Sequence, residues 1–154
     1  MNYNLNATLP KQETYQHPWY TLQQELGNTT TSEFQSELKQ RLEQTGGRSI
    51  EWAAGLFEGE GWLSHCANGS WKMAIDMTCA DVMWDWYIAI GCRGHLGGMY
   101  KRPSSKPHHK PSMEWRTSNR DLIFELVCEL FPYMGARRRE KMVEFLNWYQ
   151  EKTK

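Results

Sequence analysis

The stretch Ala53-Ala54-Gly55-Leu56-Phe57-Glu58-Gly59-Glu60-Gly61 decides how the rest of the chain is interpreted. Gly55 and Gly59 share one face of a helix, where each glycine costs about 1 kcal/mol relative to alanine. Close approach of a second helix backbone would offset that cost. Glu58 and Glu60 lie at the helix C-terminus, where the dipole disfavours carboxylates and a bound cation would stabilise them. From periodicity alone, a glycine-rich turn with solvated acids is the better interpretation.

Alternating side chains mark the strongest predicted strand. Trp71, Met73, Ile75 and Met77 alternate mainly with polar residues, which is the period of a half-buried strand. The other predicted elements are helices over 49–59, 81–90 and 135–151, a helix that ends before Pro132, and strands over 62–67, 70–79, 95–102 and 112–118. The order α-β-β-α-β-β-α-α predicts an α+β domain, with a four-stranded antiparallel saddle-like sheet, helices on one face and the other face open.

Capping residues and composition set the boundaries. Ser118 and Asp121 match an S-x-x-D capping box, which predicts a helix start at that point. Residues 1–48 are polar and carry one predicted helix, over 32–45. We therefore expect 1–48 to be a partly irregular N-terminal extension and 49–151 to form the domain.

Charge is unevenly distributed along a chain whose formal net charge is zero. Residues 93–120 hold seven Lys or Arg against one acid, a net charge of +6, whereas residues 49–92 hold one base against six acids, a net charge of −5. A solvated loop would explain a basic segment. Because aromatic residues and strand-like alternation flank it, a surface for a polyanion is the better interpretation.

Cysteine spacing and hydropathy exclude several classes of protein. None of the four cysteines belongs to a C-x-x-C pair, so we expect each to be a small buried hydrophobic residue and not a zinc ligand. No apolar run approaches the roughly 20 residues that span a bilayer, and no signal peptide is visible at the N-terminus. The sequence predicts a soluble, intracellular protein that is not secreted and has no membrane partner.

The stretch 53–61 resembles the LAGLIDADG motif of homing endonucleases, in the variant that ends D-G-E-G. Gly55, Glu58, Glu60 and Gly61 fall on the motif's glycine and acidic positions, although Glu58 stands where Asp is usual. The predicted order of elements is also the family's. The resemblance covers about residues 49–150 and extends to a tryptophan strand, a capped helix, a proline-aromatic break and a basic pair at Trp115–Asp121, Leu130–Met134 and Arg137-Arg138.

The resemblance implies a homodimeric DNA endonuclease encoded by a mobile intron. One motif copy per chain means that two chains would cut a near-palindromic target. Motif helices of the two copies would meet at Gly55, Glu58 and Gly59. Glu60 and the Gly59 carbonyl would bind Mg²⁺, for which Mn²⁺ can substitute, and the metal would activate water and polarise the phosphate. Arg137 would be the basic catalytic residue, with Arg138 or Arg139 as substitutes.

The family's open sheet face lies in the DNA major groove, so the resemblance also implies DNA contacts. The groove-side residues of the second and fourth strands would read bases, and the loop from Lys101 to Lys110 would follow the phosphates. The expected DNA-binding residues are Lys72, Asp76, Thr78, Lys101, Arg102, Lys106, His109, Lys110, Glu114 and Arg116. The protein would then be found at DNA, in the cytoplasm, nucleoid or an organelle.

Two other functions stay open at this point. Some family members keep the fold without cutting, and bind intron RNA as splicing maturases or DNA as regulators. Cys79 or Thr78 stands where the family often places a polar residue that positions water, and this favours the non-cutting functions. Glu60 favours the enzyme, because a pure binder needs no acid beside phosphate. A protein–protein module would leave the basic segment 93–120 unexplained.

Overall fold

The computed structural model describes residues 36, 39–40, 43, 47–100, 108 and 110–154. The elements in this part of the chain are α3 (Ile50–Glu60), β1 (Gly61–His65), β2 (Trp71–Met77), α4 (Ala80–Ala89), β3 (His95–Leu96), β4 (Met113–Thr117), α5 (Arg120–Leu130), the 3-10 turn η3 (Phe131–Tyr133) and α6 (Ala136–Lys152). The predicted order of elements and the predicted α+β class are therefore confirmed.

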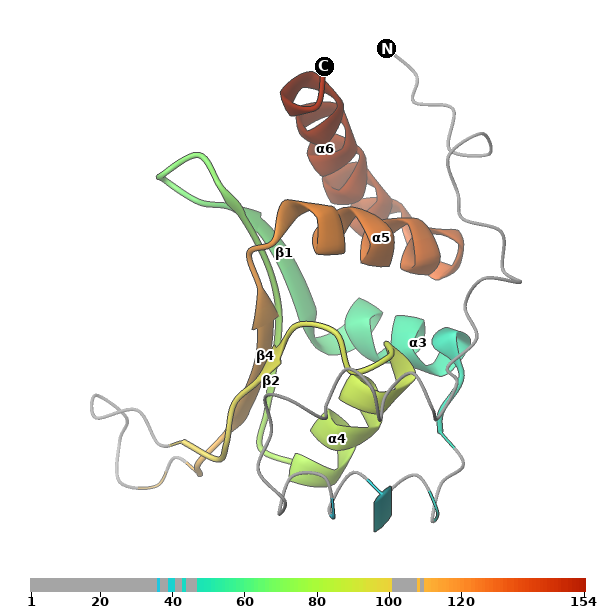
Figure 1. Cartoon of the computed structure of the whole chain (residues 1–154), viewed down its shortest axis with the longest axis vertical. Coiled ribbons are helices and arrows are strands. Elements are labelled where there is room, and N and C mark those ends of the chain that lie inside the picture. The colour runs from blue at the N-terminus through green and yellow to red at the C-terminus, as the bar shows by residue number, and fades with distance from the viewer. Residues whose placement is uncertain (1–35, 37–38, 41–42, 44–46, 101–107, 109) are drawn as a thin grey trace.

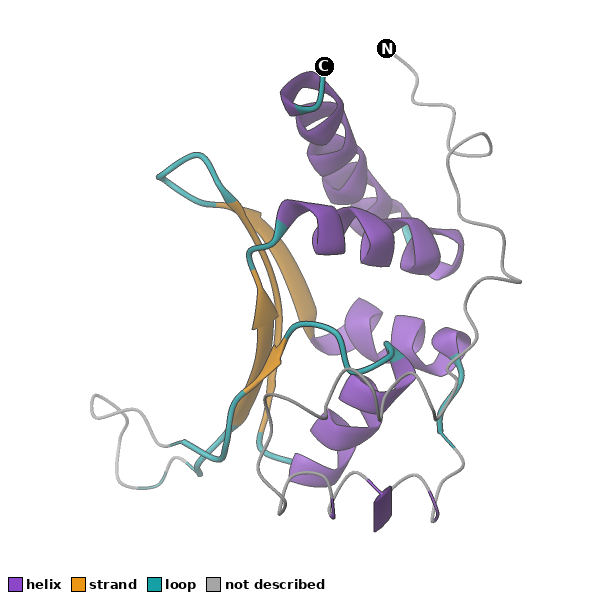
Figure 2. Ribbon diagram, in the orientation of Figure 1, coloured by secondary structure: helices purple, strands orange, loops and turns teal. Residues whose placement is uncertain are grey.

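The strands form one antiparallel sheet in the order β1-β2-β4-β3. Figure 1 shows the sheet nearly edge-on, with all the labelled helices on one side and the opposite face open and concave. Figure 2 shows the same two layers coloured by type of element. This arrangement confirms the predicted open face, which carries no helix in the described part of the chain.

Side-chain alternation in β2 explains which face of the sheet is covered. Trp71, Met73 and Ile75 point toward the helices and are buried, whereas Lys72 and Asp76 lie on the open face and are half-buried. The side chains that fill the core beneath the helices include Trp86, Trp115, Phe57, Phe145, Met83 and Leu126. Trp86 packs edge-on against Trp115, with ring centroids 5.2 Å apart.

A tight turn between α4 and β3 attaches the end of the sheet to the helix layer. The Arg93 guanidinium makes a bidentate ion pair with Glu129 of α5, at 2.6 and 3.0 Å, and the Trp115 indole N–H donates to the Arg93 carbonyl at 2.8 Å. Gly94 has φ +83° and lies so close to the Trp115 ring that a Cβ would clash. Burial raises the pKa of Glu129, while the Arg93 guanidinium opposes that rise.

Several local predictions were wrong. Of the strand expected over 95–102, the described residues 95–100 form only His95–Leu96, followed by an isolated bridge between Tyr100 and Ser112, because Gly97 and Gly98 interrupt the alternation. Residues 101–102 lie outside the described part of the chain. Asn119, not Ser118, caps α5, since its side chain accepts from the next two backbone N–H groups of the helix.

The prediction that every cysteine is buried was also wrong. Cys128 is buried, Cys66 and Cys92 are half-buried, and Cys79 is exposed. None of the described helices is long and apolar enough to span a membrane. Most of the helix predicted over 32–45 lies outside the described residues, so the boundary at residue 48 stays a prediction.

Candidate active site and nucleic-acid interface

Glu60 is the last residue of α3, and its side chain is exposed. The helix begins at Ser49, whose hydroxyl accepts from the Trp52 N–H at 3.1 Å. Its covered side carries Ala53, Ala54 and Phe57, all fully buried. No described residue forms a hydrogen bond or ion pair with the Glu60 carboxylate. The helix therefore presents an acid at its C-terminal end, next to the first residue of the sheet.

Glycine is required at position 61 because a larger side chain would not fit there, and not because of its backbone conformation. Its φ of −83° is open to any residue, but a Cβ at this position would overlap the ring of Phe57. Phe57 is fully buried and cannot move aside without disturbing the core. The last glycine of the motif thus lets β1 start directly beneath the end of α3, which fixes Glu60 at the junction.

The last carbonyl groups of α3 differ in whether they accept a hydrogen bond. The Phe57 carbonyl accepts from the Gly61 N–H, and the Glu58 carbonyl accepts from the Arg138 guanidinium at 3.1 and 3.3 Å. No described residue donates to the Gly59 carbonyl. A helix end leaves such a carbonyl available to solvent or to a cation. Gly59 and Glu60 therefore offer two oxygen ligands at one point of the surface.

These oxygens fit a hard divalent cation, but only as part of a larger site. Mg²⁺ takes carboxylate, carbonyl, water and phosphate oxygens. Among the described residues there is no group of three or more His, Cys, Asp or Glu side chains that could hold a metal ion. Glu60 and Gly59 thus supply two protein oxygens, and water and phosphate oxygens are of the kind that complete such a site.

Glu58 connects α3 to the start of α6. Its carboxylate accepts from the backbone N–H of Gly135, the N-cap residue of α6, at 3.3 Å. A carboxylate at a helix N-terminus is stabilised by the helix dipole. At the other end of α3, the Tyr133 hydroxyl donates to Glu51 at 3.1 Å. The segment from η3 into α6 is thus fixed along α3, and the predicted role of Glu58 in a dimer interface stays a prediction.

The three arginines at the start of α6 have different environments. Arg138 donates to the Glu58 carbonyl and lies over the Phe57 ring, with 5.3 Å from its guanidinium carbon to the ring centroid. Burial lowers the pKa of Arg138. Arg139 donates to two carbonyls of η3. Arg137 is exposed in the same helical turn, and its catalytic role stays a prediction.

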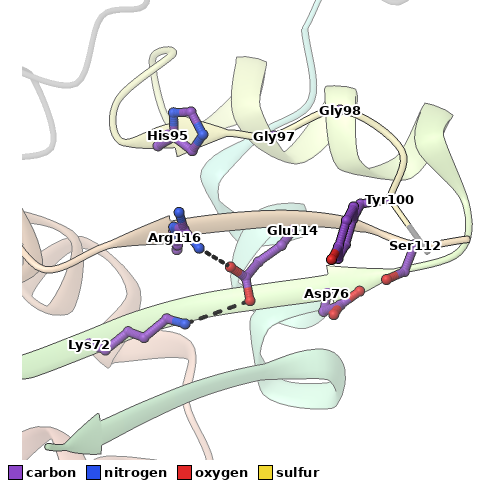
Figure 3. A pocket seen from close by; sticks show the side chains of 9 residues that line it. All are labelled: Lys72, Asp76, His95, Gly97, Gly98, Tyr100, Ser112, Glu114 and Arg116. Carbon is purple, nitrogen blue, oxygen red and sulfur yellow. Dashed lines mark hydrogen bonds and ion pairs between the residues drawn. The ribbon is translucent and has the colours of Figure 1, made fainter. Parts of the chain in front are cut away.

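A hollow of about 420 Å³ lies on the open face of the sheet (Figure 3). Near its centre, Glu114 on β4 makes ion pairs with Arg116 at 3.1 Å and with Lys72 on β2 at 3.6 Å. The Lys72 ammonium also lies 5.9 Å from the centroid of the Trp62 ring. The hollow is lined by Lys72, Asp76, His95, Gly97, Gly98, Tyr100, Ser112, Glu114 and Arg116.

The structure brings together four of the predicted DNA-binding residues, and these are Lys72, Asp76, Glu114 and Arg116. Thr78 is exposed just after β2, and Lys110 is exposed just before β4. Lys101, Arg102, Lys106 and His109 lie outside the described residues.

The other side of the hollow was not predicted from the sequence. His95 pairs with Arg116 in register, and Tyr100 pairs with Ser112 through an isolated bridge. The Gly97-Gly98 interruption made the phase of this segment impossible to assign from alternation. The sequence signal for this side is the aromatic residue Tyr100 shortly after the glycine pair. The structure shows that its side chain is exposed.

Cys79 lies two residues after the end of β2 and, with Thr78, stands where the family often places a polar residue. It is exposed and serves as the N-cap residue of α4, although its side chain makes no capping hydrogen bond. A thiol is a weak hydrogen-bond donor and acceptor, so it positions water less well than a hydroxyl or amide.

Four helices packed on one face of a four-stranded antiparallel open sheet are consistent with the LAGLIDADG homing endonuclease fold. A scan against protein-family models finds no match, and neither does a search of curated proteins. Among solved structures, the chain is similar to the group I intron-encoded homing endonuclease I-CeuI complexed with DNA. The TM-score is 0.51 at 12% sequence identity, over 85% of this chain and 70% of that one. At this identity the likeness shows the fold.

Proposed function

We propose that the chain is a site-specific double-stranded DNA endonuclease that acts as a homodimer on a near-palindromic target. The observation that carries the proposal is the exposed Glu60 carboxylate beside the available Gly59 carbonyl, at the end of a helix whose outer glycines, Gly55 and Gly59, are exposed. The fold shared with an endonuclease that was solved with DNA supports the same conclusion.

The outer side of α3 supports the homodimer. Gly55 and Gly59 are exposed, and a Cβ added to either would meet nothing within 4 Å. Trp52 and Leu56 on the same side are half-buried, so α3 carries apolar residues on two opposite sides. Apolar side chains on the outer side of a helix gain free energy when a partner covers them. A second α3 packed against the glycines would bury this side and bring two Glu60 carboxylates together.

Three groups of this chain would take part in the chemistry: the Glu60 carboxylate, the Gly59 carbonyl and the Arg137 guanidinium. Glu60 and the Gly59 carbonyl would hold the cation, which when bound would polarise the phosphate and lower the pKa of a water molecule. Two neighbouring carboxylates favour a cation between them, because without it they resist joint ionisation. Arg137 would stabilise negative charge on phosphate oxygens, and it cannot act as a base because arginine stays protonated.

The open sheet face would bind the duplex. Its concave shape and its row of polar side chains on β2 and β4 suit the major groove, where base edges present donors and acceptors. The exposed Lys110 and the neighbouring basic residues would contact phosphates, which makes binding sensitive to salt.

A randomised duplex library tests the proposal. The full-length wild type, Glu60→Gln and the control Glu151→Gln, an exposed acid near the end of α6, are each incubated with Mg²⁺ or with a chelator. We expect enriched near-palindromic cut ends from the wild type and the control in Mg²⁺. Glu60→Gln and all chelator samples should give none.

The other outcomes decide between the competing functions. Retention of duplex without cutting by any variant would replace the enzyme with a DNA-binding regulator. Retention of RNA alone would replace it with a maturase. Equal cutting by wild type and Glu60→Gln would show that the active site lies elsewhere.

A further inference from the structure

The charges in the hollow nearly cancel. Lys72 and Arg116 contribute two positive charges, and Asp76 and Glu114 contribute two negative charges when His95 is neutral. A site built for phosphate gathers uncompensated cations. A base edge, by contrast, offers both donors and acceptors and is matched by a mixed set of side chains. The composition of the hollow therefore suits base recognition better than phosphate binding.

Glu114 is the acid of the hollow that pairs with both of its cations. It contacts Arg116 on its own strand at 3.1 Å and Lys72 across the β2–β4 ladder at 3.6 Å. Figure 3 shows the two cationic side chains reaching the Glu114 carboxylate from different directions. The side chains of Lys72 and Glu114 are 30% and 23% exposed, so water screens their pair less than it screens a fully exposed ion pair. Arg116 is 57% exposed, and its pair with Glu114 is screened more.

The same carboxylate would distinguish between partners that cover the hollow. A duplex that covers the hollow removes water from Glu114, and an ionised carboxylate that loses water must gain donors. Amino groups of cytosine or adenine at the right position supply such donors, whereas a phosphate supplies none and repels the acid. Glu114 would thus weaken phosphate contacts, which any sequence can make, and would favour a base pair whose edge presents an amino group at this position.

We propose that Glu114 is a specificity-determining residue that restrains Lys72 and Arg116 from binding phosphates of arbitrary sequence. This inference rests on the proposed function, because it assumes that the open face binds duplex DNA. It predicts that removing the charge of Glu114 strengthens non-specific binding and weakens discrimination, which is the opposite of what loss of a simple DNA contact would do.

Equilibrium binding of fluorescent duplexes in a chelator tests this inference without cleavage. The variant is Glu114→Gln, and the control Glu151→Gln makes the same change in net charge far from the sheet face. We expect Glu114→Gln to bind a random-sequence duplex more tightly and with a salt slope steeper by about 0.9 for each additional phosphate contact. The ratio of target to random-sequence affinity should fall by about 5- to 150-fold.

Two further variants keep the test decisive. Adding Lys72→Gln or Arg116→Gln to Glu114→Gln should abolish the gain in non-specific affinity, and the melting temperature identifies any variant that does not fold. Equal behaviour of Glu114→Gln and Glu151→Gln, with a wild type that binds duplex, would overturn the inference alone. A wild type that binds no duplex would overturn the proposed function and this inference with it.

Discussion

Arg138 and Arg137 are neighbours in sequence, but their replacement by alanine should have different effects. Arg138→Ala should lower the free energy of unfolding, whereas Arg137→Ala should leave it almost unchanged. Arg138 makes two hydrogen bonds to the Glu58 carbonyl and covers the Phe57 ring. Hydrogen bonds to a charged group contribute about 1.5–3 kcal/mol, and a cation–π contact adds about 0.5–2 kcal/mol. Water can partly replace the lost donor, so we expect Arg138→Ala to cost about 2–3 kcal/mol.

Urea denaturation followed by far-ultraviolet circular dichroism measures that cost. For a chain of this size, it corresponds to a fall in Tm of roughly 4–12 °C. Arg137→Ala is the matched control and should change the free energy of unfolding by less than about 0.5 kcal/mol, because Arg137 is exposed. In the cleavage assay, however, Arg137→Ala should lose activity while still folded. Equal destabilisation by the two substitutions would refute this account of how α6 is fixed to α3.

Four further predictions concern glycines and cysteines. Gly61→Ala should destabilise the fold by about 1–3 kcal/mol in urea denaturation, because its Cβ would overlap the Phe57 ring; an unchanged midpoint would contradict that packing. Gly55→Leu should leave the fold intact but shift the protein from dimer to monomer in sedimentation, and an undisturbed dimer would place the interface elsewhere. Burial raises the pKa of Cys128 to about 11, so the folded chain keeps a proton that the unfolded chain releases, and stability should fall between about pH 9 and pH 11. Cys128→Ala should lessen this fall in urea denaturation, and an identical pH dependence would contradict the assignment. In native protein a thiol reagent should modify the exposed Cys79 before Cys128.

The fold could be predicted because its strongest signals are local and periodic. Alternation in β2 identified the buried side chains Trp71, Met73 and Ile75, and Ser49 marked the start of α3. The resemblance of 53–61 to a known motif then supplied the position of Glu60 at the helix end. These features depend on neighbours within a few residues, which a sequence displays directly.

What could not be predicted depends on contacts between distant segments. Glu58 and Arg138 are 80 residues apart, and nothing local indicates that a guanidinium meets the Glu58 carbonyl. The shared ion pairs of Glu114 likewise require the register between β2 and β4. The error at the start of α5 had a different cause, because Ser118 and Asn119 are both good capping residues and only the backbone geometry selects between them.

The role of Glu60 in metal-dependent cleavage is tested most directly by comparing wild type with Glu60→Gln on the duplex that library selection recovers. Affinity is measured in a chelator and the single-turnover cleavage rate in Mg²⁺. Glu60→Gln should bind the duplex within about threefold of wild type, which is well under the tenfold change of 1.4 kcal/mol. Its cleavage rate should fall by at least about 10²-fold, as expected when an essential electrostatic group is removed from an active site. Cleavage by Glu60→Gln at the wild-type rate would contradict the claim that this carboxylate holds the catalytic metal.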